Sequence, residues 1–218
     1  MASPHTFRGE TSAQRQARRR SALIEATLDL VYESGLQSVG VRSACACAGL
    51  TSRYFYESFA SLDELLVATH EQIADEVLAA GAAALHQDSR SSAPRARLRS
   101  GLAAAVGIVV DDPRKGTFVA ALAAGDTKLQ RRRREIVLRV ADAVLAETAP
   151  GQASCDARAR SVTLYVAGGL VELTVAFLAG DLDLERGRLI DQLTTLTAGV
   201  AAAGFGAASP ARARLQRR

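Results

Sequence analysis

The sequence predicts an all-α protein of about nine helices, and three observations lead to this prediction. Hydrophobic residues make up 48% of the chain, much of this share is alanine, and only five of 218 residues are proline, a composition that favours helix. Apolar residues recur three and four positions apart along most of the chain. No convincing run of alternating β-branched residues is present, so strands are not expected.

The first expected helix covers residues 18–34. Its apolar stripe contains Ile24, Leu28 and Val31, and Gly35 follows as a typical C-terminal glycine. Residues 1–17 have no periodic apolar face, so we expect them to form a disordered, basic N-terminal arm.

Two short helices are expected next, at 41–48 and 52–58. Gly49 lies where the chain must turn sharply between them, a position that favours a residue able to adopt positive φ. Thr51 or Ser52 can cap the second helix through a hydroxyl group. This is the sequence form of a helix-turn-helix, whose second helix enters the major groove of DNA.

A longer helix is expected from about residue 61 to residue 86. Ser61 and Glu64 have the spacing of a capping box at its start, and Leu65 and Ile73 belong to its apolar side. Polar, glycine-containing or proline-containing breaks divide the rest of the chain at 88–94, 111–113, 125–126, 150–151 and 180–181. The last two expected helices, 153–179 and 184–203, are the most apolar.

The flanks of the two short helices complete a recognisable pattern. Residues 54–66 read YFYESFASLDELL and resemble the signature LYxHFxSKEELL of the TetR family of regulators. Residues 19–35 read RRSALIEATLDLVYESG and resemble the first helix of that family. The resemblance covers roughly 18–70, and beyond it only length and helical texture agree.

The resemblance implies a division of the chain into four parts. These are the arm at 1–17, a helix-turn-helix DNA-binding domain at 18–66, a helical regulatory and dimerisation domain at 67–207 and a disordered basic tail at 208–218. The implied function is that of a homodimeric repressor, released from a palindromic operator in double-stranded DNA by an apolar or amphipathic small molecule. The alternatives are a ligand-independent regulator or activator of the same fold, or a helical protein-interaction module.

The resemblance also implies which side chains contact DNA. They are Arg42, Thr51, Ser52, Arg53, Tyr54, Tyr56 and Ser58. Arg53 can read O6 and N7 of guanine or bind a phosphate, and Tyr56 can bond a phosphate or pack against the first helix. Glu57 can accept a hydrogen bond from cytosine N4 or face solvent.

Three positions depart from the family pattern. Gly40 replaces a usual threonine, Leu62 a usual lysine and Ser58 a common histidine. These changes predict weaker phosphate anchoring by the scaffold and more reliance on the arginine-rich arm. Two other arginine-rich stretches, 131–134 and 212–218, are interpreted as solvated surface.

The regulatory domain is predicted less sharply. Two helices from each subunit are expected to form a four-helix bundle whose interface contains Leu164, Gly168, Val171, Val175, Leu189, Leu193 and Leu196. The ligand pocket is expected to contain Val106, Phe118, Leu122, Leu138, Tyr165, Glu172 and Phe177, although simple core packing accounts for most of them individually.

Several function classes are not supported by the sequence. His5, His70 and His86 are scattered, and no Ser/His/Asp constellation, glycine-rich phosphate loop or metal-ligand spacing occurs, so we expect no enzyme, cofactor or metal. Three cysteines, an odd number, argue against a disulfide framework and for a reducing cytoplasm. The apolar run 162–179 approaches the length of a membrane span, but Glu172 in its middle favours a buried helix of an oligomer.

Overall fold

The computed structural model describes residues 11–87, 93–123, 134–143 and 157–205, and within these ranges the chain forms nine α-helices and no strand. The N-terminal elements are α1 (Ser12–Ser34), the short 3-10 helix η1 (Leu36–Ser38), α2 (Val41–Cys47) and α3 (Ser52–Ser58). The later helices are α4 (Leu62–Gln87), α5 (Pro94–Val110), α6 (Pro113–Ala123), a helix at 134–143, α8 (Ala157–Ala179) and α9 (Arg186–Phe205). The predicted all-α fold is confirmed.

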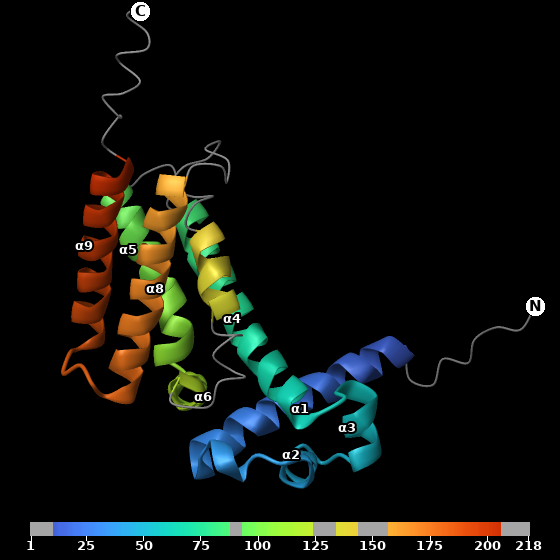
Figure 1. Ribbon diagram of the computed structural model, residues 1–218. Coiled ribbons are helices and arrows are strands. Elements are labelled where there is room, and N and C mark those ends of the chain that lie inside the picture. Colours follow the sequence, from blue (N-terminus) through green and yellow to red (C-terminus); the bar gives the residue numbers. More distant parts are fainter. Residues whose placement is uncertain (1–10, 88–92, 124–133, 144–156, 206–218) are drawn as a thin grey trace, which may run out of the picture.

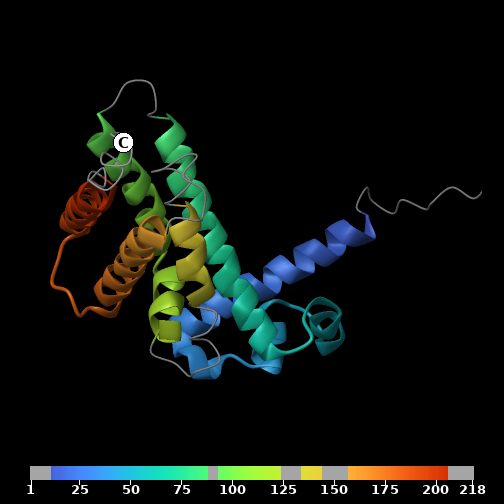
Figure 2. The same ribbon diagram turned by 45° about the horizontal axis from the view of Figure 1, so that its top comes forward.

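The molecule has two parts, which we call the head and the body (Figure 1). The head consists of α1, α2, α3 and the first turns of α4. The body consists of the rest of α4 and the later helices, with α5 packed against α4 and α9, and α8 packed against α9 (Figure 2). Because α4 runs from the head into the body as one continuous helix, it is a direct mechanical connection between them.

The head is held by its own apolar core. Phe55 of α3 and Phe59, the C-cap residue of that helix, are fully buried, and they pack with Leu23 and Ile24 of α1 and Leu65 of α4. Burial of each aromatic or aliphatic side chain of this size stabilises a fold by about 1.5–3 kcal/mol. The two phenylalanines are four residues apart, and this spacing places both rings on the core side of the head.

A second core lies where the head meets the body. Phe118 and Leu122 of α6 pack with Leu28 and Val31, which lie in the C-terminal half of α1. At Gly116 a Cβ atom would lie only 2.7 Å from the carbonyl oxygen of Val109, so the absence of a side chain there allows α6 to approach α5 closely. The body therefore touches the head through α6 as well as through α4.

The start of the first helix differs from the prediction. The helix begins at Ser12 instead of Arg18, because Thr11 and Gln14 form a capping box: Gln14 N donates to Thr11 Oγ1 at 3.2 Å and Thr11 N to Gln14 Oε1 at 2.7 Å. The predicted disorder is therefore wrong for 12–17, which are helical although largely exposed. The rest of the predicted arm and the tail at 208–218 lie outside the described residues, as do 131–133.

Candidate nucleic-acid interface

The turn of the helix-turn-helix depends on one glycine. Gly49 has φ of +65°, a left-handed conformation that side chains with a Cβ adopt at a cost, as its position in the sequence predicted. The chain is closed around it by a hydrogen bond from Leu50 N to Cys45 O at 2.8 Å. This closure fixes the direction in which α3 leaves α2.

The recognition helix α3 has one buried face and one exposed face. Phe55 and Phe59 lie toward the core with their ring centroids 6.0 Å apart. The opposite face exposes 84% of the Arg53 side chain and 62% of Tyr56, and Tyr54 is 38% exposed. Three of the predicted DNA-contacting side chains therefore share a helix whose orientation is set by two buried rings.

The hydroxyl groups at the start of α3 do not have the predicted capping role. Thr51 is the N-cap residue with an extended backbone, but its side chain makes no capping hydrogen bond. Ser52 instead bonds the buried thiol of Cys45, whose pKa is raised by burial despite this bond. Both residues are exposed overall and lie at the N-terminus of α3, where backbone N–H groups favour an anion.

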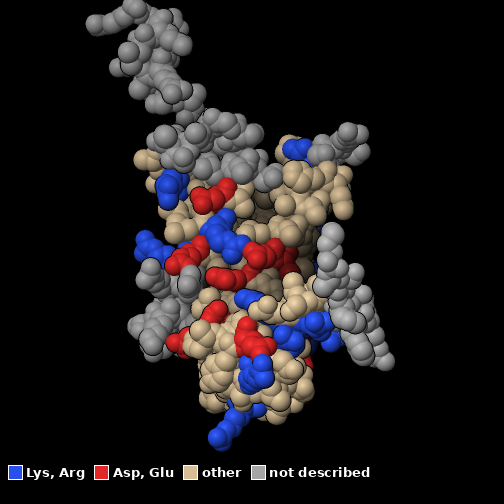
Figure 3. Space-filling model, turned by 90° about the vertical axis from the view of Figure 1, so that its right-hand side faces the viewer, with Lys and Arg blue, Asp and Glu red and all other residues tan. Residues whose placement is uncertain are grey.

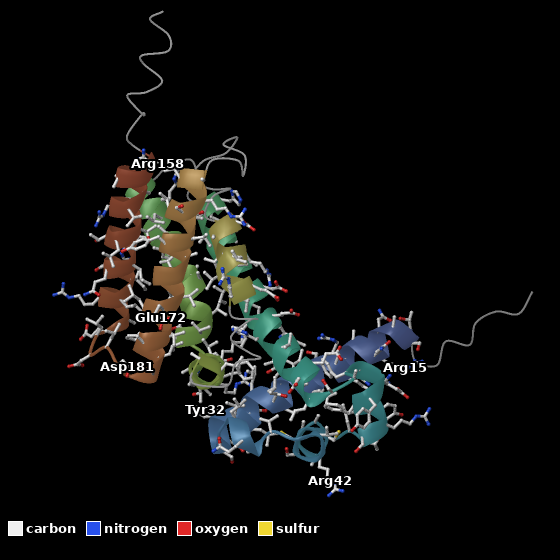
Figure 4. The ribbon with its side chains drawn as sticks, in the orientation of Figure 1. Arg15, Tyr32, Arg42, Arg158, Glu172 and Asp181 are labelled. Carbon is white, nitrogen blue, oxygen red and sulfur yellow. The ribbon has the colours of Figure 1, made fainter. Side chains whose placement is uncertain are left out.

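At the start of α2, Arg42 is exposed and projects away from the head (Figure 4). Gly40, which replaces the family's threonine, is the N-cap residue, and its N–H donates to Ser43 Oγ at 2.8 Å. The Ser43 hydroxyl group thus satisfies the N–H of Gly40, whereas a threonine hydroxyl at position 40 would accept from an N–H in the first turn of α2. At the end of α3, the Ser58 hydroxyl donates to Tyr54 O at 2.9 Å, so it is engaged within its own helix.

The N-terminal extension of α1 lies along α3, which the sequence analysis missed. Gln16 Nε2 donates to Glu57 O at 3.1 Å, and Arg19 Nη2 lies 3.4 Å from Glu57 Oε2. The Arg19 guanidinium also stacks over the ring of Tyr54 at 4.5 Å, a cation–π contact. The Thr11–Gln14 capping pattern is the signal in the sequence that indicates this earlier helix start.

Charges of both signs are interspersed on the side of the molecule that carries the start of α1 and α3 (Figure 3). On α3 itself, Arg53 Nε lies 3.1 Å from Glu57 Oε1, so the exposed arginine is paired with an acid one turn away. Attraction of DNA to this surface depends on individual, positioned arginines more than on a broad field of one sign.

The residues expected to line a ligand pocket do not meet around one cavity. Phe118 and Leu122 belong to the core between head and body, whereas Val106 packs with Leu189 and Leu193 in the body. Tyr165 is 72% exposed, and Glu172 is also exposed on α8 (Figure 4). The half-buried members of the predicted set are Leu138 and Phe177. The fully buried apolar residues of the predicted pocket, Val106, Phe118 and Leu122, are therefore explained by core packing within the chain.

Neither of two hollows found among the described residues matches the predicted pocket. One of about 50 Å³ lies between α4 and the helix at 134–143 and includes His70 and Ile136. The other, of about 400 Å³, is open to solvent and includes Asp111, Lys115 and Arg186. Drug-sized ligands occupy about 300–1,000 Å³ in largely enclosed sites.

The predicted dimer residues divide into three groups by their exposure. Leu189 and Leu193 are 1% exposed and pack against Val106 inside the chain, so they do not lie on a surface that a partner reaches. Leu196, on the same helix, is 53% exposed. The members on α8 are half-buried: Leu164, Gly168, Val171 and Val175. Leu189 and Leu193 are unsuited to the predicted dimer interface because core packing of α9 against α5 already buries them.

Among the described helices, α8 alone is long and apolar enough to cross a membrane, which is weak evidence taken singly. Only 22% of its most apolar stretch is buried within the chain. Within the described ranges no group of three or more His, Cys, Asp or Glu side chains is arranged to hold a metal ion.

The fold was compared with solved structures. A TetR-family regulator from a Rhodococcus species, described as putative, superposes with a TM-score of 0.65 over 85% of this chain and 99% of the other, at 19% identity. A TetR-family regulator from Streptomyces coelicolor gives a TM-score of 0.63 over 86% and 83%, at 20% identity. The chain has the TetR-family regulator fold.

Two further known proteins are similar to this chain. The multidrug-binding protein EbrR, solved with imidazole, gives a TM-score of 0.58 over 82% of this chain and 94% of the other, at 22% identity. The HTH-type transcriptional regulator BetI of Burkholderia thailandensis is 37% identical over 86 residues, which are 39% of this chain and 43% of the relative. The match thus spans less than half of that relative's length. No protein-family profile matches the chain.

Proposed function

We propose that the protein is a sequence-specific DNA-binding transcriptional regulator that reads its site with α3. The observation that carries the proposal is the exposed face of α3, where Arg53 and Tyr56 project from a helix anchored by Phe55 and Phe59. A short helix presented in this way fits the major groove, which is about 12 Å wide.

Each exposed group has a contact for which its chemistry is suited. The fork of Arg53 matches O6 and N7 of guanine, and Tyr56 reaches a phosphate with its hydroxyl group. Thr51 and Ser52 lie at the helix N-terminus, where an adjacent phosphate is favoured. Arg42, at the start of α2, adds a further phosphate contact on the same surface.

The protein acts as a homodimer in this proposal, because reading a palindromic operator requires two heads one helical turn apart. The apolar helix α8 supports this arrangement, since only 22% of its most apolar stretch is fully buried within one chain. Added Cβ atoms at Gly168 and Gly169 would meet nothing within 4 Å, so another backbone can approach there closely. Leu196 of α9, more than half exposed, extends the apolar surface.

The proposal also includes that a small molecule controls DNA binding and that the protein acts as a repressor in the cytoplasm. Its support is the fold shared with EbrR, a multidrug-binding protein. In this chain, movement of α6 would reach the head through Phe118, which packs against Leu28 and Val31 of α1. A ligand shifts such an equilibrium only by the difference between its affinities for the two head arrangements.

The test begins with selection of a duplex from a random DNA library by the purified wild-type protein. The Arg53→Ala variant is then compared with Arg188→Ala, which removes the same charge from an exposed position on α9. If Arg53 reads guanine, its loss weakens binding to the selected duplex by about 1–3 kcal/mol and relaxes the preference at one base pair. The α9 variant should bind as the wild type does, apart from a small uniform change.

An equal loss of affinity for selected and scrambled duplexes would assign Arg53 to a phosphate instead. Enrichment of no sequence by the wild type would contradict the proposal and favour a helical protein-interaction module. If DNA binding is specific but no screened apolar compound alters it, the protein is a ligand-independent regulator.

A further inference from the structure

An acidic side chain lies at the centre of the exposed face of α3, where a DNA phosphate backbone would be close. Its two carboxylate oxygens are both engaged by arginines: Glu57 Oε1 with Arg53 at 3.1 Å, and Glu57 Oε2 with Arg19 at 3.4 Å. We propose that Glu57 is a specificity-determining residue that withholds these two arginines from DNA of arbitrary sequence. This inference rests on the proposed function in DNA binding.

The local structure brings the three charged groups together from two helices. Arg53 and Glu57 are four residues apart on α3, so their side chains lie on one face of that helix. Arg19 comes from α1, and its position is fixed by the ring of Tyr54 beneath the guanidinium and by the neighbouring bond from Gln16 to Glu57 O. The carboxylate thus ties the basic start of α1 to the leading arginine of the recognition helix.

The two ion pairs of Glu57 are weak enough for both arginines to leave the carboxylate and bind DNA instead. The Arg53 side chain is 84% exposed and that of Glu57 38%, and ion pairs in such surroundings contribute little. The Nε of Arg19 is buried and makes no hydrogen bond to the described residues, so the resting position leaves one donor of this guanidinium unsatisfied. Phosphate oxygens offer both arginines charge-assisted bonds of the same kind, so each arginine can exchange one anionic partner for another.

After this exchange, the groups that the Glu57 carboxylate faces depend on the DNA sequence. Once its arginines bind DNA, the carboxylate faces the duplex without its previous partners. An amino group in the right position, N4 of cytosine or N6 of adenine, donates to it, whereas base edges that present only acceptors leave a negative charge beside phosphates. Releasing the two arginines from Glu57 costs free energy, and only the correct DNA sequence offsets this cost by donating a hydrogen bond to the carboxylate. DNA of arbitrary sequence therefore binds more weakly.

Removal of the charge without change of shape tests this inference. Glu57→Gln is compared with the wild type on the selected duplex and on a scrambled duplex of the same length and composition. The control is Glu185→Gln, which makes the same change in net charge at an exposed position directly before α9. Affinities are measured over a series of salt concentrations.

We expect Glu57→Gln to raise affinity for the scrambled duplex by roughly threefold to tenfold, the range set by weak exposed ion pairs and by new phosphate contacts. Affinity for the selected duplex should change less, so that the specificity ratio falls. The slope of log K against log salt on scrambled DNA should steepen by about one unit for each arginine that gains a phosphate. Glu185→Gln should leave the ratio and the slope as they are.

Equal gains on both duplexes, matching those of the control, would overturn the inference, since net charge alone would account for them. An unchanged affinity for scrambled DNA would overturn it too. Glu57→Asp is a second variant that keeps the charge but shortens the reach to Arg19; it should raise affinity for scrambled DNA by a smaller factor. A wild-type protein that selects no DNA sequence at all would instead remove the proposed function, and this inference with it.

Discussion

The guanidinium Nη1 of Arg114 lies 2.8 Å from Oδ1 of Asp29, an ion pair that joins the first turn of α6 in the body to α1 in the head. The same nitrogen lies 3.2 Å from Glu25 Oε2, and Nη2 lies 3.1 Å from Asp112 Oδ2. Hydrogen bonds from Arg114 to Asp112 and Asp29 raise the pKa of the guanidinium above its usual range, so it stays charged. One arginine thus binds three carboxylates across the junction between head and body.

The first prediction concerns this junction. Arg114→Met should lower the free energy of unfolding by about 1 kcal/mol, because three carboxylates lose a shared, partly buried partner. Arg186→Met is the matched control, since among the described residues Arg186 pairs with one carboxylate, that of Asp111, within the body, and the two side chains are 45% and 61% exposed. Urea unfolding of both variants measures the difference, and equal values would show that the junction contributes nothing beyond an ordinary surface pair.

A pH dependence follows from Asp112 in the same cluster. Burial by itself raises the pKa of Asp112, but hydrogen bonds from Arg114 and the charges of Arg114 and Lys115 outweigh it and lower the pKa below the ordinary 3.8. Since the folded pKa is below the unfolded one, the stabilisation is complete above 3.8 and is lost as the pH falls through the lowered value. Asp112→Asn should be less stable than the wild type near neutral pH, and the two should converge in acid. A gap that persists unchanged to about pH 2 would exclude ionisation of Asp112 as its cause.

The third prediction concerns the turn between α2 and α3. Gly49→Ala should destabilise the protein by about 1–2 kcal/mol, because φ of +65° places the new Cβ against the backbone although no other atom lies within 4 Å. Gly49→Asn should cost clearly less, since asparagine tolerates this conformation. Thermal unfolding provides the comparison. Identical melting temperatures for both variants would mean that the turn relaxes to a different conformation.

The last prediction separates the proposed dimer surface from the core. Leu196→Glu should convert a dimer to monomers at micromolar concentration, because an unpaired charge would be buried on the apolar surface of α8 and α9. The isolated monomer should remain folded, since Leu196 is 53% exposed within one chain. Ala83→Glu adds the same charge at an exposed position on α4 and should leave the assembly intact. Sedimentation velocity measures both, and a dimeric Leu196→Glu variant would place the interface elsewhere.

The sequence by itself determined the all-α class and the helix-turn-helix, because the signals for both are local. Gly49 marks a turn that needs positive φ, and Phe55 and Phe59 are spaced to share one helix face; both features act over a few residues. The start of α1 at Ser12 was readable in the same way, from Thr11 and Gln14. It was missed because the added turns carry polar side chains and no apolar stripe.

Tertiary structure alone decided which apolar helix surfaces of the body are buried within the same chain and which stay exposed. Leu193 and Leu196 are three residues apart on one helix, yet the first is 1% exposed against α5 and the second 53%. Phe118, expected in a pocket, is instead buried against α1, some ninety positions away in the sequence. Helical periodicity shows that a side of a helix is apolar, but the partner for that side is set by which distant segments pack together, and this depends on the shape of the whole chain.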